Sequence, residues 1–190
     1  MDALDAIMTR RSMNKVAERR PDQDAIRTLI EAAVRAPNHH LTQPWRFIVL
    51  GGSALGALGD AMAERLRRET PDDPFLDQKA ERERAKAFRA PVIVTVVFVP
   101  SSNPKAIEVE DRYAVGAAIE NMLLAAHALG LGVYLRTGPA AYDAGVRQVL
   151  GLTPEEEVAG FLYLGYVDGD PPEMPPRAQA AERTTWVGWD

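Results

Sequence analysis

The segment APNHHLTQPWRFIVL, residues 36–50, joins the end of a helix to the start of a strand through a polar loop. Pro37 cannot continue the preceding helix, and Pro44 favours an extended conformation for Gln43, so stiff residues hold both ends of the loop. Between the prolines lie the polar side chains Asn38, His39, His40, Thr42 and Gln43. They admit two interpretations: an ordinary turn with capping side chains, or a ledge that holds a cofactor. Polar residues at two distant places, residues 10–12 and 131–138, favour the ledge.

Length and composition limit the class of protein to which this chain can belong. A chain of 190 residues predicts one domain, residues 1–190, in which residues 166–190 form an extended C-terminal tail. The absence of cysteine excludes disulfides and thiolate chemistry and favours the reducing cytoplasm. A net charge of -5 argues against nucleic acid as a partner. The N-terminus is acidic and no apolar run has the length of a membrane span, so we expect neither a secretory signal nor a membrane partner.

Hydrophobic periodicity predicts the elements on either side of the loop. A first helix is expected over about residues 2–11, with Arg10 and Arg11 in its last turn. The second helix carries the apolar stripe Ile26, Leu29, Ile30, Ala33 and Val34. After the loop we expect a strand at residues 46–50 and then a helix that Ser53 can cap. The charged stretch at residues 69–89 predicts a mobile loop, a candidate lid, and then a solvated helix from about residue 77.

The second half of the chain predicts the buried part of the sheet. Residues 92–99 are nearly all apolar and β-branched, which is typical of a central strand covered on both faces. A long helix at residues 108–129 has little polar surface, so we expect it in a core or a subunit interface. Strands at residues 131–135 and 158–165 follow, with a short helix at 146–150 between them, and the last strand is too apolar for an exposed edge. Trp186 and Trp189 in the tail need a groove, on this subunit or on a partner.

Several kinds of active site are missing from the sequence. It has no G-x-S-x-G elbow and no G-x-x-x-x-G-K loop, and the third glycine of a dinucleotide fingerprint is missing after Gly130-Leu131-Gly132. His39 and His40 are adjacent, so on extended backbone they would face opposite ways, and His127 is far along the chain. We therefore expect no metal site and no covalent nucleophile.

The polar groups that remain suit one anionic, planar ligand. Basic and hydroxyl groups near the N-terminus and at a strand end can bind a phosphate, and the loop can bind the polar edge of a heterocycle. These candidates are Arg10, Arg11, Ser12, Lys15, Arg136 and Thr137 for the phosphate, with His39 and Gln43 for the heterocycle.

Four motifs stand in a fixed order along the chain. They are Arg10-Arg11-Ser12, the segment from Ala36 through Phe47, the run from Gly130-Leu131-Gly132 to Leu135-Arg136-Thr137-Gly138, and Gly160-Phe161-Leu162-Tyr163-Leu164-Gly165. As an ordered set they cover nearly the whole chain up to Gly165. The set resembles the nitroreductase family of flavoproteins, in particular its small, minimal branch.

This resemblance implies a fold and a cofactor site. The fold is an α+β sandwich, a mostly antiparallel sheet flanked by helices, in a domain-swapped type of homodimer that binds FMN at the subunit interface. The implied FMN contacts are Arg10, Arg11, Ser12, Leu135, Arg136 and Thr137, with His39 and Gln43 supplied by the partner chain. The implied NAD(P)H stretch is Ala125, Ala126, His127, Ala128, Leu129 and Gly130. The chain departs from the family at Asn14 and Val16, where relatives carry a basic and an aromatic residue, and at Leu135, where the minimal branch has Trp.

The resemblance also implies a reaction. NADH or NADPH would pass hydride to flavin N5 and leave, and a nitroaromatic, quinone or similar electron-poor acceptor would then bind the same face, in a ping-pong cycle with no catalytic side chain. Two alternatives stay open: a flavoenzyme with another reaction, such as a dehalogenase or enone reductase, and a flavin-binding or electron-transfer protein without small-molecule turnover. No pocket for a 2′-phosphate is legible in the sequence, so both nucleotides stay open as donor.

Overall fold

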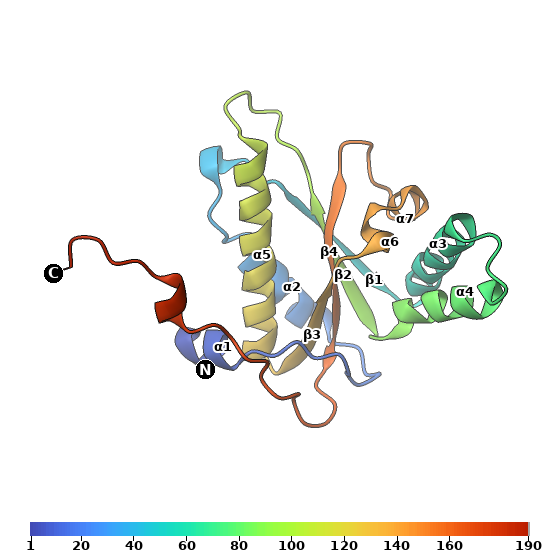
Figure 1. Cartoon of the computed structure of the whole chain (residues 1–190), viewed down its shortest axis with the longest axis horizontal. Coiled ribbons are helices and arrows are strands. Elements are labelled where there is room, and N and C mark those ends of the chain that lie inside the picture. Colours follow the sequence, from blue (N-terminus) through green and yellow to red (C-terminus); the bar gives the residue numbers. More distant parts are fainter. Residues whose placement is uncertain (190) are drawn as a thin grey trace.

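The computed structural model describes residues 1–189, in which four strands form one sheet (Figure 1). The strands are β1 (Trp45–Gly51), β2 (Val92–Phe98), β3 (Leu131–Arg136) and β4 (Glu157–Tyr166). Their order across the sheet is β1-β2-β4-β3, and each neighbouring pair runs antiparallel. The predicted antiparallel sheet with flanking helices is therefore confirmed. The four predicted strands agree with the observed ones to within one residue at each end.

Helices and short 3-10 turns connect and cover these strands. The helices are α1 (Ala3–Thr9), α2 (Gln23–Ala33), α3 (Ser53–Glu69), α4 (Leu76–Ala85), α5 (Glu108–Ala128), α6 (Pro139–Tyr142) and α7 (Ala144–Val149). The 3-10 turns are η1 (His39–Leu41), η2 (Lys86–Phe88) and η3 (Ala180–Arg183). Helix α6, which the sequence analysis did not predict, begins with Pro139 in its first turn, where a missing N–H costs nothing.

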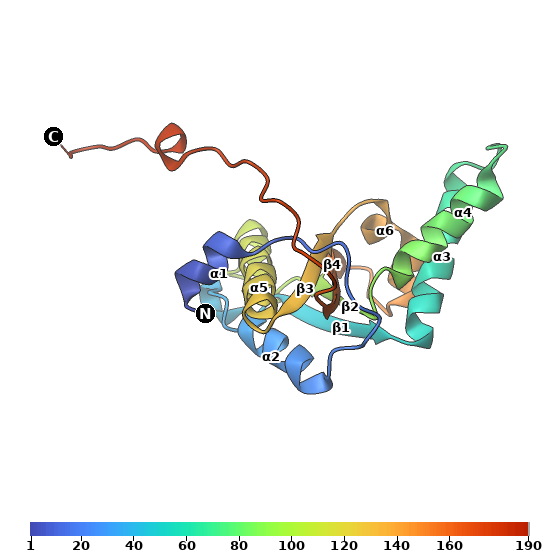
Figure 2. The same cartoon turned by 90° about the horizontal axis from the view of Figure 1, so that it is seen from below.

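Strand β2 separates two hydrophobic cores, and all of its residues are buried. Because side chains alternate along a strand, Val94 and Val96 face the core with α2 and α5, whereas Ile93 faces the core with α3, α6 and α7. Figure 2 shows α2 and α5 on one side of the sheet and α3 and α4 on the other. The central position predicted for residues 92–99 is confirmed, and so is the interior position of β4.

An ion pair between the buried Glu156 and the partly exposed Arg46 ties the turn before β4 to strand β1. Arg46 donates from Nε to Glu156 Oε1 at 2.8 Å and from Nη2 to Oε2 at 2.7 Å. Glu156 also accepts the backbone N–H of Thr153 at 2.9 Å. These donors, led by Arg46, hold the pKa of Glu156 below its ordinary value although burial opposes them. The carboxylate therefore stabilises the fold in its charged form.

The first helix is shorter than the sequence predicted. Asp2 caps it by accepting the backbone N–H of Asp5 at 2.9 Å, and the helix ends at Thr9. The prediction that Arg10 and Arg11 occupy its last turn is wrong: Arg10 is the residue that follows the helix, in an extended conformation. Both side chains thus belong to the segment that leaves α1.

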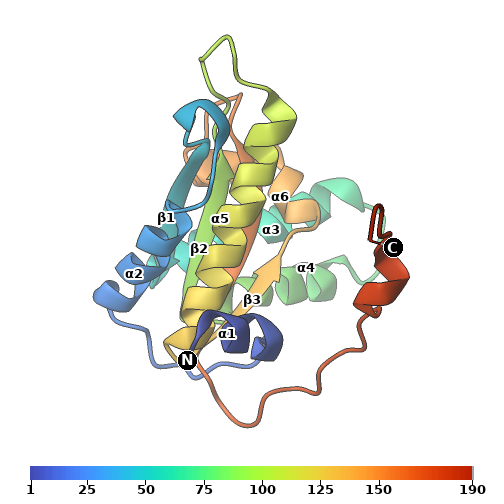
Figure 3. The ribbon, with the colours of Figure 1, turned by 90° about the vertical axis from the view of Figure 1, so that its left-hand side faces the viewer.

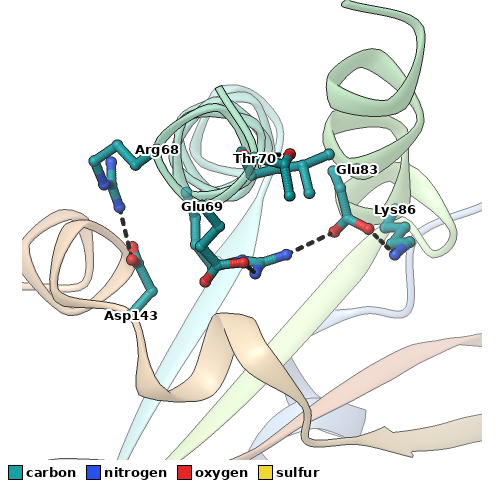
Figure 4. A network of polar contacts seen from close by, with 8 residues as sticks. Arg68, Glu69, Thr70, Glu83, Lys86 and Asp143 are labelled. Carbon is teal, nitrogen blue, oxygen red and sulfur yellow. Dashed lines mark hydrogen bonds and ion pairs between the residues drawn. The ribbon is translucent and has the colours of Figure 1, made fainter. Parts of the chain in front are cut away.

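Helix α4 is the helix predicted from about residue 77, and most of its residues are exposed as predicted, but one side packs along α3. Ala80 of α4 is fully buried, and Arg65 of α3 is only 5% exposed. The guanidinium of Arg65 is paired with Glu69 and lies 3.6 Å from Glu83 of α4, which is also bound by Lys86 (Figure 4). This network fixes the orientation of α4 on α3.

One side of α5 and the tail remain uncovered in the single chain. Figure 3 shows α5 in front of the sheet with α1 across its lower end and the tail leading away. Tyr113 of α5 is 71% exposed, and Trp186 and Trp189 are 69% and 77% exposed. The two indoles contact each other edge to face, and no groove formed by residues 1–189 buries them. Among these residues, none of the helices has the length and apolar character needed to cross a membrane.

Close packing of α3 on α4 makes Gly59 a test of this arrangement. A Cβ atom at Gly59 would lie 2.7 Å from the carbonyl oxygen of Arg84, whereas one at Gly56, on the same helix, meets nothing within 4 Å. We expect Gly59→Ala to lower the free energy of unfolding by about 1–2 kcal/mol, because overpacking outweighs the gain in helix propensity. Gly56→Ala is the matched control and should be neutral or stabilising by up to about 1 kcal/mol. Urea unfolding measures both; equal effects at the two sites would contradict the packing described.

The Arg46–Glu156 pair predicts a contribution to acid stability. Since the pKa of Glu156 is lowered in the folded state, its stabilisation is complete above its unfolded value near 4.5 and is lost as the pH falls through the folded value. Glu156→Gln should cost about 1–2 kcal/mol at pH 7, and this difference from the parent should shrink below about pH 4. Unfolding measured from pH 7 to pH 3 tests the sign: a difference that grows on acidification would refute it.

Candidate functional site

The segment that leaves α1 gathers positive charge beside the C-terminal end of α5. Arg10 Nε lies 3.3 Å from Glu120 Oε1, and Thr9 Oγ1 is 2.8 Å from His127 Nε2. Arg11 donates to the carbonyl oxygens of Thr9 and Arg10, while its Nε is buried and has no partner among residues 1–189. A buried donor without an acceptor is uncommon in folded proteins and marks a place where an anion would fit.

The local electrostatics agree with this reading. Burial, followed by the charges of Arg10 and Arg11, lowers the pKa of His127 below its ordinary value. His127 therefore stays neutral at pH 7 and adds no further positive charge. Glu120 is the carboxylate paired with this cluster, and about half of its side chain is exposed. The net field at the exit of α1 favours an anion.

A cavity of about 440 Å³ opens onto these groups. Its walls come from α1, from the segment after it and from the tail: they are Ile7, Met8, Arg10, Arg11, Ser12, Asn14, Pro172, Glu173, Met174, Pro175 and Arg177. All three residues of the predicted N-terminal motif line it. The tail supplies the opposite wall, so the two ends of the chain form this cavity together.

A second cavity, of about 370 Å³, lies at the end of β3. Its lining comprises Met13, Asn14, Lys15, Val16, Arg89, Tyr134, Arg136 and Tyr163. The guanidinium of Arg136 lies 4.8 Å from the ring centre of Tyr134 and 5.9 Å from that of Tyr163. Burial raises the pKa of Tyr163, so its phenol stays protonated. Asn14 lines both cavities, which places Arg136 and the N-terminal motif on either side of one short segment.

Two glycines allow residues 13–16, in the segment that follows α1, to lie against the sheet. Met13 donates its backbone N–H to Val133 at 2.9 Å, and Val16 forms an isolated bridge with Val167. A Cβ atom at Gly132 or at Gly165 would stand 2.8 Å from the Val16 side chain. Both positions need glycine so that residues 13–16 can pack closely on the sheet, and this packing fixes the position of the segment that follows α1.

The other two residues of the strand-end motif lie differently from Arg136. The side chain of Leu135 packs against the core formed with α2 and α5, on the sheet face opposite Tyr134. Thr137 is exposed just beyond the strand. Of the three, Arg136 is the one whose side chain lines the cavity.

The loop at residues 38–43 is strained and does not have the geometry predicted. His40, Leu41 and Gln43 have φ angles of 57°, 53° and 46°, which non-glycine residues seldom adopt. The expected extended conformation of Gln43 is therefore wrong. Its backbone N–H instead binds Asn38 Oδ1 at 2.9 Å, which lets the side chain of Asn38 hold the turn. Such strain concentrates at functional sites.

The two loop histidines also differ from expectation. Because η1 curls the backbone, the rings of His39 and His40 stack with centroids 3.9 Å apart instead of facing opposite ways. His39 Nδ1 lies 2.8 Å from Glu110 Oε2, near the start of α5. Thr42 donates to the buried Asp111 at 2.5 Å and fastens the loop to the same helix end.

One chain does not bring all the predicted cofactor contacts together. The loop with His39 and Gln43 is fastened to the start of α5 at Glu110, whereas Arg10 lies beside Glu120 in the second half of that helix. Glu110 and Glu120 are ten residues apart on this helix, which is about 15 Å along its axis, so α5 keeps the two groups apart (Figure 3). The structure thus joins the N-terminal motif to the region of Arg136 and leaves His39 and Gln43 remote from both.

The stretch predicted for NAD(P)H lies mostly within the end of α5. Ala126 is fully buried in the core with α2, and His127 contacts Thr9. Ala128, Leu129 and Gly130 are exposed after it. Arg89, Tyr134 and Tyr163 also line the cavity and were not predicted from the sequence, since nothing in their local pattern shows that β3, β4 and η2 converge.

Comparison with known proteins identifies the family. The model of the nitroreductase family matches residues 7–166. The chain is 33% identical over 165 residues to YdjA of Escherichia coli K12, a predicted NAD(P)H nitroreductase, with 87% of this chain and 88% of YdjA covered. It is 31% identical over 182 residues to YfhC of Bacillus subtilis 168, of the same description, with 95% and 92% covered.

Solved structures show the same fold. A nitroreductase-like protein from Desulfovibrio desulfuricans, crystallised in complex with FMN, superposes with a TM-score of 0.74 at 27% identity and covers 100% of this chain and 99% of its own. The nitroreductase-like family protein from Bacillus cereus superposes with a TM-score of 0.80 at 24% identity, with 99% and 97% covered. On the match to the family model and the identity to its curated members, this chain belongs to the nitroreductase family.

Proposed function

We propose that this chain is an FMN-dependent oxidoreductase that takes electrons from NADH or NADPH and passes them to a small electron-poor acceptor, such as a nitroaromatic or a quinone. The observation that carries the proposal is the cluster of Arg10, Arg11 and Ser12 with its unpartnered buried Arg11 Nε. The FMN complex of the relative from Desulfovibrio desulfuricans and the name of YdjA support it.

The residues present fit the phosphate and ribityl chain of FMN. A phosphate dianion needs cationic donors in a confined place, and Arg10 and Arg11 offer them beside the hydroxyl of Ser12. A phosphate oxygen would satisfy the orphaned Arg11 Nε. Arg136 supplies a further guanidinium across Asn14, and Tyr134 and Tyr163 add flat surface to the same cavity. In this proposal Leu135 and Thr137 act through the backbone at the end of β3.

FMN, when bound, supplies two-electron redox chemistry between a nicotinamide and the acceptor. The protein binds and orients it: the arginines hold the phosphate, and the guanidinium of Arg136 offers positive charge to an electron-rich ring edge. The protonated phenol of Tyr163 and the tyrosine rings exclude water from the wall of the cavity. Donor and acceptor occupy this pocket in turn, and no side chain is assigned as nucleophile.

We further propose a homodimer with FMN at the interface. His39 contacts Glu110 at the start of α5 and Arg10 contacts Glu120 in its second half, so an antiparallel contact of α5 with its symmetry mate would bring the loop of one chain to the arginines of the other. The exposed side of α5, with Tyr113, offers the surface for that contact. Exchange of the tails would give Trp186 and Trp189 a partner groove in a domain-swapped manner.

Of the stretch predicted for NAD(P)H, residues 125–130, only the end beyond Ala126 is open to a nucleotide, because Ala126 is sealed in the core. Leu129 and Gly130 present side chain and backbone to a ligand there. The protein thus acts by binding and orienting the donor and then the acceptor in the same pocket.

Arg10→Ala tests the cofactor site. We expect purified parent protein to be yellow and to release FMN on heating, and we expect Arg10→Ala to bind FMN at least about tenfold more weakly, because a charge-assisted contact to the phosphate is lost. Arg27→Ala on α2, an exposed arginine paired with Asp24 outside both cavities, is the control. Visible absorption and equilibrium dialysis give the affinities. Full FMN occupancy in Arg10→Ala would refute the role of Arg10, and a colourless parent that cannot be reconstituted would refute the function.

Tyr113→Glu tests the dimer. A charge placed on the exposed side of α5 would be buried without a partner in the proposed interface, so the variant should run as a monomer and lose FMN although Arg10 is intact. Val149→Glu, at an exposed apolar position on α7, is the matched control and should stay dimeric. Light scattering on a sizing column reports the mass. A parent protein that is monomeric while it carries FMN would exclude the interface site.

A further inference from the structure

A row of cations lies along α4 and η2 and borders the proposed FMN site at Arg89. Lys79, Arg82, Lys86 and Arg89 follow one another at intervals of three, four and three residues, which puts them on one side of the helix. We call these four residues the α4 basic row. They line a cavity of about 520 Å³ together with Leu66, Glu83 and Ala85. Four cations and one carboxylate around one cavity are unusual in a chain whose net charge is -5.

Two members of the row have no carboxylate partner. Lys79 is paired with Asp73 and Lys86 with Glu83. Glu83 is also engaged by Arg65, so its charge is already shared within the α3–α4 network (Figure 4). No ion pair within residues 1–189 involves Arg82 or Arg89, and both are exposed at the cavity. Their donors are therefore available to an anion from solution.

Arg89 connects this cavity with the proposed FMN site. It lines the cavity of the α4 basic row and also the cavity with Arg136 and Tyr163. From Arg89 to Arg82 the chain covers seven residues of helix and 3-10 turn, which is about 11 Å. A ligand that reaches from the cavity with Arg136 and Tyr163 past Arg89 would thus meet the two unpaired guanidinium groups of the row, those of Arg89 and Arg82.

We infer that the α4 basic row binds the phosphates of the dinucleotide donor and selects NADPH over NADH. This inference rests on the proposed function and names the donor of the same site. Arg89, next to the flavin pocket, faces the pyrophosphate, and Arg82 with Lys79 faces the 2′-phosphate at the adenosine end. Leu66 and Ala85 provide apolar contact for the adenine. A row of this length suits an extended polyanion better than the single carboxylate of a small aromatic acceptor.

The row and the end of α5 are alternative places for one dinucleotide. α4 lies with α3 on one side of the sheet, whereas α5 lies on the other (Figure 2). A nucleotide within one chain therefore uses Arg82 or Leu129, and substitutions at the two positions distinguish the surfaces.

Direct binding tests the inference without turnover. We expect the FMN-loaded parent protein to bind adenosine 2′,5′-bisphosphate at least about tenfold more tightly than adenosine 5′-monophosphate in a titration calorimeter, since the second phosphate adds charge-assisted contacts. Arg82→Gln should remove most of that difference. Arg27→Gln, which deletes the same charge on α2 across the sheet, should retain it.

Kinetics give the second readout. Arg82→Gln should raise the KM for NADPH by about tenfold and change the KM for NADH by less than about twofold, with FMN content unchanged. Equal binding of the two adenosine nucleotides, an unaltered NADPH preference in Arg82→Gln, or loss of nucleotide binding only in Leu129→Asp would each overturn the inference. A rise in KM confined to 4-nitrobenzoate would overturn it in favour of an anionic acceptor. A protein that is bleached equally by NADH and NADPH overturns the inference and leaves the proposed function intact, whereas failure to bind FMN removes the proposed function itself.

Discussion

Strand β2 is the element on which the rest of the molecule depends. Its residues are buried on both faces, and neighbouring strands occupy both of its edges. A strand of this kind must be apolar on every side, since neither face meets water. Two helix layers can then pack independently on the sheet, α2 and α5 on one face and the α3–α4 side on the other. The cavity with Arg136 lies where those layers leave the end of β3 uncovered.

The two layers have different tasks. The layer with α5 carries exposed apolar surface, and the strained loop at its start is fastened by Asp111 and Glu110. The layer with α4 is held by a network of charges around Arg65 and presents cations to solvent. A subunit contact needs the first kind of surface and a phosphorylated ligand needs the second. Because the two surfaces lie on opposite sides of the sheet, a subunit contact on the α5 side would leave the cations on the α4 side open to a ligand.

Much of the fold could be predicted from local sequence patterns, whereas the site could be predicted only in part. The strands were predictable because short β-branched apolar runs such as residues 92–98 are typical of buried strands. Helix α2 was predictable because the apolar residues from Ile26 to Ala33 recur with the period of a helix. The conformation of Gln43 was mispredicted because a hydrogen bond to Asn38, not local preference, sets it. Arg89 was not found because its importance comes from convergence of β3, β4 and η2, which no local pattern records. Arg10 and Arg136 were identified because basic groups near the N-terminus and at a strand end can bind a phosphate, and the family resemblance then implied the same two residues.

The position of Arg89 has a consequence for how bound anions influence each other. One guanidinium serves two adjoining cavities, so its charge cannot be fully committed to both at once. An anion in either cavity lowers the attraction that the other can draw from Arg89, and thermodynamic reciprocity makes the penalty equal in both directions. Binding of an anion in one cavity is therefore energetically coupled, through Arg89, to binding of an anion in the other. A ligand that spans both escapes this antagonism, whereas two separate anions must share a single counter-charge.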